Sequence, residues 1–162
     1  HGLTWPLLVK YYGNESLMAN LIYHVNMPKP LRLAEQYLIR AEAYCRRANP
    51  DYNAAAKDLT TLRGARMSTA SNVSLTAENY LETIADERVR ELYMEGFRLW
   101  DLKRWGNLYR NGEGFTRKQQ TSSLKEGSSL RVKADNPLFT WPIPQHELES
   151  PGSEVQPNES NK

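Results

Sequence analysis

Side chains that bind metals or form disulfides are scarce in this chain. Its 162 residues include one cysteine, Cys45, and three histidines, His1, His24 and His146. A single thiol excludes an internal disulfide framework and any site built from several cysteine ligands. His24 and His146 have no histidine, aspartate or glutamate at a recognised ligand spacing on the same predicted element, so the sequence predicts no metal centre. Cys45 lies on an apolar helical stripe and is expected to be a buried, unreactive thiol.

Long apolar runs, a strong net charge and catalytic motifs are also lacking. No stretch approaches the roughly 18 consecutive apolar residues of a membrane-spanning helix. The 21 basic and 19 acidic residues are interspersed and leave a net charge of +2, which gives no basis for binding nucleic acid or an anionic membrane. The motifs GxSxG, HExxH, GxGxxG and the P-loop do not occur, so the sequence indicates no enzymatic activity and no cofactor.

Apolar residues three and four positions apart predict a helical hairpin near the middle of the chain. The first helix is predicted over residues 31–48 and ends before Pro50. The second is predicted from Asn53, as its N-cap, to Arg66. The short connection favours antiparallel packing, in a degenerate form of the tetratricopeptide pattern. One such unit cannot bury all of its apolar surface, so further helices are expected to pack against it.

Less regular segments surround this hairpin. Residues 1–27 show no sustained period and are predicted to form an irregular lead-in. Residues 107–136 are rich in Gly, Ser, Lys and Gln and are predicted to form a long surface loop. Residues 151–162 form a polar tail.

The segment that follows Thr76 combines a helical period with charges on its apolar side. Thr76 is expected to cap one long helix, or two helices broken at Gly96, ending at Gly106. At 100° per residue, an arc about 120° wide contains apolar residues together with two cations and two anions. These charged residues are Arg88, Glu91, Glu95 and Arg98. A second apolar side predicts that the element lies between two layers. It contains Val89, Tyr93, Phe97 and Trp100.

Two interpretations of these charges compete. Glu87, Glu91 and Glu95 recur at four-residue steps, and neighbouring carboxylates one turn apart could serve a glycoside hydrolase. Arginines at steps of three and four residues would instead keep the carboxylates ionised, whereas catalysis needs one with a raised pKa. Because an unpaired buried charge is strongly destabilising, the pattern favours a structural ion network without catalytic residues. The predicted network consists of Arg88, Glu91, Glu95, Arg98, Asp101 and Arg104.

Several aromatic residues lie outside the strongest apolar stripes. A flat ring in such a position either packs into local core or offers a face on which a sugar ring stacks. The candidate ligand-binding residues on this basis are Trp5, Tyr11, Tyr12 and Tyr109.

Four segments occur in the order found in the C-terminal part of SusD/RagB proteins. They are LRLAEQYLIRAEAYCRRA at Leu31 to Ala48, DLTTLRGAR at Asp58 to Arg66, DERVRELYMEGFRLWDLKRWG at Asp86 to Gly106, and WPIPQHEL at Trp141 to Leu148. The whole chain, 1–162, therefore resembles a C-terminal part of a SusD/RagB-like domain. Residues 28–150 carry the resemblance, between the lead-in and the tail.

The resemblance implies an all-α, SusD-like fold of tetratricopeptide-like helical hairpins with long irregular loops. It also implies a non-enzymatic protein of the Bacteroidetes outer-membrane surface, which binds oligosaccharides and delivers them to a TonB-dependent SusC-like transporter. Peptide binding, as in RagB-like members, and a tetratricopeptide-like scaffold for protein partners are the alternatives. Because the chain contains no lipid-anchored cysteine, attachment to the membrane is expected only through an anchor outside it. In this family the motif that residues 87–104 resemble belongs to the framework, which favours the ion network.

Overall fold

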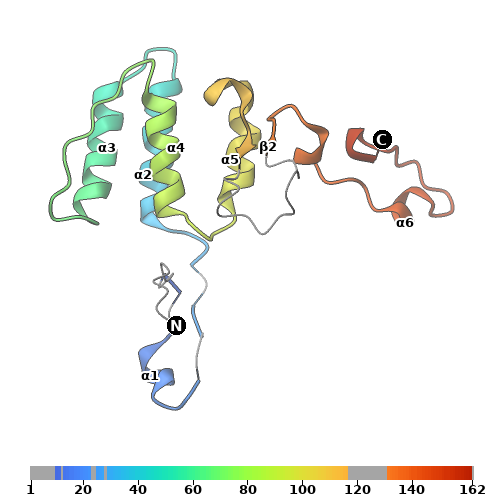
Figure 1. The fold of residues 1–162 in the computed structure, drawn as a ribbon, viewed down its shortest axis with the longest axis horizontal. Coiled ribbons are helices and arrows are strands. Elements are labelled where there is room, and N and C mark those ends of the chain that lie inside the picture. The colour runs from blue at the N-terminus through green and yellow to red at the C-terminus, as the bar shows by residue number, and fades with distance from the viewer. Residues whose placement is uncertain (1–9, 12, 23–24, 28, 117–130, 162) are drawn as a thin grey trace, which may run out of the picture. The chain divides into compact units, whose positions relative to one another are not determined.

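The computed structural model describes residues 10–11, 13–22, 25–27, 29–116 and 131–161 (Figure 1). The chain forms two compact units, His1–Arg32 and Leu33–Lys162. In the first unit a single turn of helix, α1 (Glu15–Met18), follows Asn14, whose side chain accepts a hydrogen bond from the Ser16 N–H. All other elements belong to the second unit.

Three helices pack side by side in the second unit and form its main core (Figure 1). They are α2 (Leu33–Arg46), α3 (Tyr52–Gly64) and α4 (Tyr80–Glu91). Their inward-facing apolar side chains are at most 4% exposed, and they include Leu38, Ala41, Cys45, Ala55, Leu59, Leu62 and Ile84. The predicted helical hairpin and the buried thiol are thereby confirmed, and α4 supplies a further helix against the hairpin. Burial raises the pKa of the Cys45 thiol to about 11.

Both predicted helix caps are wrong. The N-cap of α3 is Asp51, whose Oδ1 accepts from the Ala54 N–H at 2.9 Å. Asp51 is as favourable a capping residue as Asn53 and lies two residues earlier in the chain. The helix therefore starts at Tyr52, and Asn53 falls inside its first turn. Helix α4 begins at Tyr80, four residues after Thr76, because the Asn79 side chain accepts from the Thr76 N–H at 2.8 Å and holds these residues in a turn.

The charged segment forms two helices, which confirms the broken-helix alternative. Helix α4 ends at Glu91, and α5 (Phe97–Trp105) starts after two residues with left-handed backbone, Met94 at φ 62° and Gly96 at φ 81°. The change of direction places the second apolar side at the surface. Its members Val89, Tyr93 and Trp100 are 39%, 53% and 62% exposed. The expectation that this side lies between layers is therefore wrong for these three side chains, whereas its fourth member, Phe97, packs against the main core.

A second apolar cluster joins α4 and α5 to the turns that follow them. It consists of Leu81, Ala85, Leu102, Trp105, Tyr109 and Phe139. The associated short elements are η1 (Gly106–Leu108), η2 (Arg110–Gly112), β1 (Phe115–Thr116), β2 (Arg131–Val132) and η4 (Pro137–Phe139). Strands β1 and β2 pair antiparallel, with Phe115 opposite Val132. The predicted loop 107–136 is thus partly regular, while 117–130 lies outside the described residues.

The remaining elements are α6 (Gln145–Leu148) and η5 (Glu159–Asn161). Asn161 ties the end of the chain to Ile143, because its side chain accepts from the Ile143 N–H at 3.0 Å and donates to the Ile143 carbonyl at 2.9 Å. Apart from the two-residue strand pair, the regular elements described are helical, which confirms the all-α class.

Gly114 allows β1 and β2 to approach, and its replacement tests that contact. A Cβ there would lie 2.2 Å from the Val132 carbonyl oxygen, on a backbone with φ +62°. Gly152, at φ +77°, has open space around it and is the matched control. Gly152→Ala should lower the free energy of unfolding by about 1–2 kcal/mol, because a side chain on left-handed backbone is strained. Gly114→Ala should lower it further, because the added Cβ also clashes with β2. Urea unfolding measures both, and equal losses would contradict the close approach.

Candidate functional site

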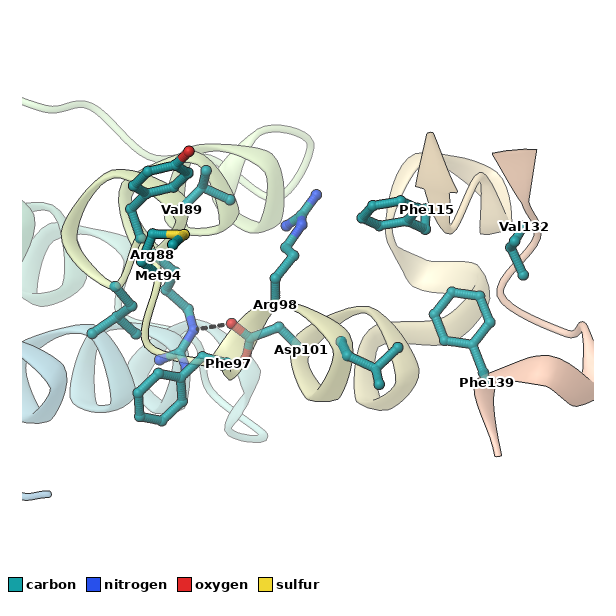
Figure 2. A pocket seen from close by; sticks show the side chains of 13 residues that line it. Arg88, Val89, Met94, Phe97, Arg98, Asp101, Phe115, Val132 and Phe139 are labelled. Atoms are coloured by element: carbon teal, nitrogen blue, oxygen red, sulfur yellow. Dashed lines mark hydrogen bonds and ion pairs between the residues drawn. The ribbon is translucent and has the colours of Figure 1, made fainter. Parts of the chain in front are cut away.

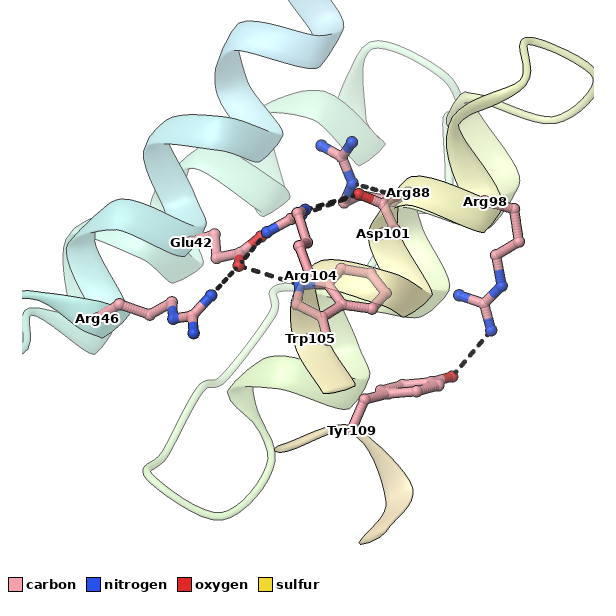
Figure 3. Close-up of polar contacts among 8 residues, drawn as sticks. All are labelled: Glu42, Arg46, Arg88, Arg98, Asp101, Arg104, Trp105 and Tyr109. Atoms are coloured by element: carbon pink, nitrogen blue, oxygen red, sulfur yellow. Dashed lines mark hydrogen bonds and ion pairs between the residues drawn. The ribbon is translucent and has the colours of Figure 1, made fainter. Parts of the chain in front are cut away.

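A buried carboxylate on α2 is the centre of the main polar cluster (Figure 3). Glu42 is 5% exposed and accepts from Arg104 Nη1 and Nη2 at 2.6 and 2.7 Å. It also accepts from Trp105 Nε1 at 3.0 Å and from Arg46 Nη1 at 2.9 Å. The first two partners come from α5, so Glu42 fixes α5 against α2.

The cluster continues from α5 to α4 through a second buried carboxylate. Asp101 is 4% exposed and accepts from Arg104 Nε at 3.0 Å and from Arg88 Nε at 2.7 Å. Arg104 therefore lies between two carboxylates, and Figure 3 shows its side chain between Glu42 and Asp101. Together these four residues make a continuous chain of charge-assisted hydrogen bonds from α2 through α5 to α4, which we call the Glu42–Arg88 chain.

Separate ion pairs join α4 to the end of α3 and to the residues after it. Glu91 accepts two hydrogen bonds from Arg66, at 2.9 and 3.0 Å. Glu87 accepts from Arg63 at 2.7 Å and from Arg90 at 3.2 Å. Both carboxylates are at least nine-tenths buried, and each is held by an arginine. Both carboxylates therefore serve as acceptors for arginines that join α4 to the end of α3 and the residues after it.

The structure divides the predicted ion network among different partners. Arg88, Asp101 and Arg104 belong to the Glu42–Arg88 chain, whereas Glu91 pairs with Arg66. Arg98 donates from Nη2 to Tyr109 Oη at 3.3 Å. Glu95 lies half-buried in the connection between α4 and α5.

The predicted network omitted Glu42, although a signal for it exists in the sequence. Glu42 occurs directly after Ala41 in the apolar stripe of α2, where a charge needs a partner. Its partners Arg104 and Trp105 are more than 60 residues away along the chain, so no local spacing reveals them.

Electrostatics keep Glu42 ionised. Burial alone would raise the pKa of this carboxyl group, but the hydrogen bonds and charge of Arg104, with donors from Trp105 and Arg46, hold it below the ordinary value of 4.5. The pKa of Arg104 is raised, because Glu42 and Asp101 outweigh the opposing effect of burial. The pair is therefore charged at neutral pH and serves to dock helices.

Of the four aromatic residues predicted to bind a ligand, Tyr109 is buried and Tyr11 is exposed. Tyr109 is 3% exposed, and its ring centroid lies 5.3 Å from that of Trp105, so it offers no free face for a sugar. It extends the buried stripe of Leu102 and Trp105 past the end of α5, which is the reason that this prediction is wrong. Tyr11 is 43% exposed in the first unit. Trp5 and Tyr12 lie outside the described residues.

A hollow of about 550 Å³ lies between the α4–α5 connection and the strand pair (Figure 2). We call it the apolar hollow, because most of its wall is made of apolar side chains such as Leu92, Phe97, Leu99, Phe115 and Val132. Its charged lining residues are Arg88, Arg98 and Asp101. The Nη1 atoms of both arginines are buried without a hydrogen-bond partner among the described residues. Each such unpaired donor costs about 1–3 kcal/mol.

A second hollow, of about 380 Å³, is lined by residues of α2 and α5, including Glu42, Asp101 and Arg104 of the Glu42–Arg88 chain. We call it the Trp100 hollow. Trp100 is 62% exposed at its edge, and charged side chains of Glu35, Arg46 and Arg104 line it beside the apolar Ile39. The helical period placed Trp100 on an apolar side, but period alone does not tell whether that side is covered.

The family comparison decides the protein's class. The sequence model of the SusD family matches residues 4–159, almost the whole chain. The chain belongs to the SusD family. No curated protein and no solved structure gives a significant match to it. SusD-family proteins bind nutrients at the cell surface, are binding proteins rather than enzymes, and work with SusC-like transporters.

Family membership confirms the resemblance found in the sequence, and with it the broad class of nutrient-binding proteins. In the described part of this SusD-family chain, no group of three potential metal-ligating side chains occurs. No described helix is both long enough and apolar enough to cross a membrane.

The pH dependence of stability tests the role assigned to Glu42. Because the folded-state pKa lies below the unfolded value of about 4.5, its stabilisation is complete above that pH and is lost as the pH falls through the folded pKa. Glu42→Gln should therefore lower the free energy of unfolding by at least about 2 kcal/mol at pH 7, and by progressively less in acid.

Glu82→Gln is the matched control, because Glu82 makes an exposed pair with Arg110. Such a pair contributes about 1 kcal/mol or less. Urea unfolding of both variants from pH 7 to pH 3 measures the difference. A deficit in Glu42→Gln that stays constant over this range would contradict an ionised, structural Glu42.

Proposed function

We propose that this protein binds oligosaccharides at the outer-membrane surface and delivers them to a TonB-dependent SusC-like transporter. The observation that carries the proposal is the family match over residues 4–159. Attachment to the membrane would be through a lipid anchor.

The state of the buried carboxylates supports binding without cleavage. Glu87 and Glu91, two of the three candidates for hydrolytic chemistry, are each engaged by an arginine at 2.7–3.0 Å, and the third, Glu95, lies in the connection between α4 and α5. A glycosidase needs one carboxyl group that is protonated and one that is free to reach the glycosidic bond. Because arginines occupy oxygens of both Glu87 and Glu91, neither carboxylate is free to reach a glycosidic bond.

The Trp100 hollow is the oligosaccharide-binding site that we propose. The exposed indole offers an apolar face to a sugar ring. Glu35, Arg46 and Arg104 beside it carry acceptors and donors for sugar hydroxyl groups. Arg46 and Arg104 are also held by Glu42, so their positions are set before a ligand arrives.

A peptide ligand is the alternative, and a specific feature of the same hollow favours it. Ile39 is 47% exposed there and Phe97 lines the inner wall. Aliphatic and aromatic peptide side chains would bury this apolar surface, whereas a neutral sugar would leave much of it exposed to water.

Calorimetric titration against panels of oligosaccharides and peptides tests the assignment. Trp100→Ala should weaken oligosaccharide binding about tenfold or more, because the ring contact is lost while the exposed position tolerates the change. Trp141→Ala is the matched control, since Trp141 is 78% exposed and does not line the Trp100 hollow. The affinity of Trp141→Ala for oligosaccharides should stay within about twofold of that of the unsubstituted protein.

Three results would contradict the proposal in different ways. Binding of peptides alone would overturn the oligosaccharide assignment. Loss of oligosaccharide affinity in Trp141→Ala but not in Trp100→Ala would show that the binding site lies outside the Trp100 hollow. Release of shortened sugars during the titration would show an enzyme.

A further inference from the structure

The apolar hollow has two facing walls and an arginine between them. Figure 2 shows Arg98 extending between Val89 and Met94 on the α4 side and Phe115 on the strand side. Its position is held by a hydrogen bond to Tyr109 Oη, and its Cζ lies 5.2 Å from the centre of the Tyr109 ring. The side chain is half-buried, so part of it reaches the open space of the hollow.

The charges that line this hollow do not balance. Two arginines face one carboxylate, Asp101, and Asp101 already accepts from Arg88 and Arg104. Arg98 has the hydroxyl group of Tyr109 as its hydrogen-bond partner instead of a carboxylate. Among the described lining residues one positive charge is therefore in excess.

Unused hydrogen-bonding capacity accompanies this excess charge. Nη1 of Arg88 and Nη1 of Arg98 make no hydrogen bond with any described residue, and Arg88 as a whole is only 4% exposed. Because both Nη1 atoms are buried, an acceptor in the hollow would relieve this deficit only once the Arg98 guanidinium group turns toward it. A carboxylate suits the planar donor fork best.

The size and chemistry of the walls define the rest of the ligand. The volume of about 550 Å³ lies within the range of small-molecule sites, and the walls are aliphatic and aromatic. We propose that the apolar hollow binds a small amphipathic carboxylate, with its apolar body against the walls and its carboxylate on Arg98. This site does not depend on the oligosaccharide proposal, because Trp100 does not line it and Arg98 does not line the Trp100 hollow.

Octanoate is the probe, with octan-1-ol and octylammonium as ligands of the same length but different charge. Calorimetry on the full chain should show saturable binding of one octanoate per chain, with octan-1-ol at least about tenfold weaker and octylammonium not bound. Arg98→Gln should reduce octanoate affinity about tenfold or more and leave that of octan-1-ol within about twofold.

Arg90→Gln is the matched control for charge, because Arg90 lies exposed on α4 and does not line the hollow. Octanoate affinity should be unchanged in it. A second comparison does not depend on Arg98: Val89→Asp adds a negative charge at the partly exposed edge and should weaken octanoate binding more than Val89→Asn does.

Several outcomes would overturn the proposal. The first is absence of octanoate binding. The second is equal affinity for octanoate and octan-1-ol with no effect of Arg98→Gln, which would make the hollow a merely apolar surface. The third is concentration-dependent dimerisation that Val89→Asp abolishes, because the hollow would then be occupied by a second copy of the chain. None of these results bears on whether Trp100 binds sugars.

Discussion

Glu42 lies among the apolar residues of α2, where a carboxylate is stable only if donors replace the water it has lost. Arg104 and Trp105 are those donors, and both are carried by α5. The burial of Glu42 therefore depends on the packing of α5 on α2. Arg104 then positions Asp101, and Asp101 positions Arg88 on α4. The second unit is thus held by its apolar cores and by a polar chain that specifies which helices meet.

The same constraint explains where the surface features lie. Helix α5 can reach Glu42 only because the chain changes direction between Glu91 and Phe97, through the left-handed residues Met94 and Gly96. Residues of α5 line both the apolar hollow and the Trp100 hollow, and Arg88, Phe97 and Asp101 contribute to both. Of the charged segment, Arg88 and Asp101 line both hollows, whereas Glu87, Glu91 and Glu95, the carboxylates considered for catalysis, line neither.

Local pattern predicted the helices well, because apolar spacing depends on neighbours along the chain. The stripe of Leu38, Ala41 and Cys45 is buried as its period predicts. Helix starts were less predictable. Asp51 competes with Asn53 as an equally good capping residue, and the Asn79 side chain accepts from the Thr76 N–H instead of capping α4.

Contacts between distant segments could not be predicted in the same way. Arg88 and Asp101 were expected in an ion network because they lie 13 residues apart on one charged segment, whereas Glu42 was missed because Arg104 is 62 residues away. The prediction that Tyr109 is a ligand-binding ring fails because three- and four-residue steps from Leu102 through Trp105 continue the buried stripe to it. Composition indicated no metal site or catalytic motif, but it does not show which apolar faces remain open. Trp100 illustrates this, since the helical period fixes its side of the helix and only the packing leaves that side exposed.

If Glu42, Arg104, Asp101 and Arg88 act as one unit, substitutions at its two ends, Glu42 and Arg88, should be energetically coupled in a double-mutant cycle. Glu42 and Arg88 share no hydrogen bond and are joined only through Arg104 and Asp101. The cycle compares the free energies of unfolding of Glu42→Gln, Arg88→Met and the double variant by urea titration at pH 7. A continuous chain predicts a coupling energy of about 1 kcal/mol or more between the two sites. Additivity within about 0.5 kcal/mol would show that the two carboxylates stabilise the fold independently and would contradict the account.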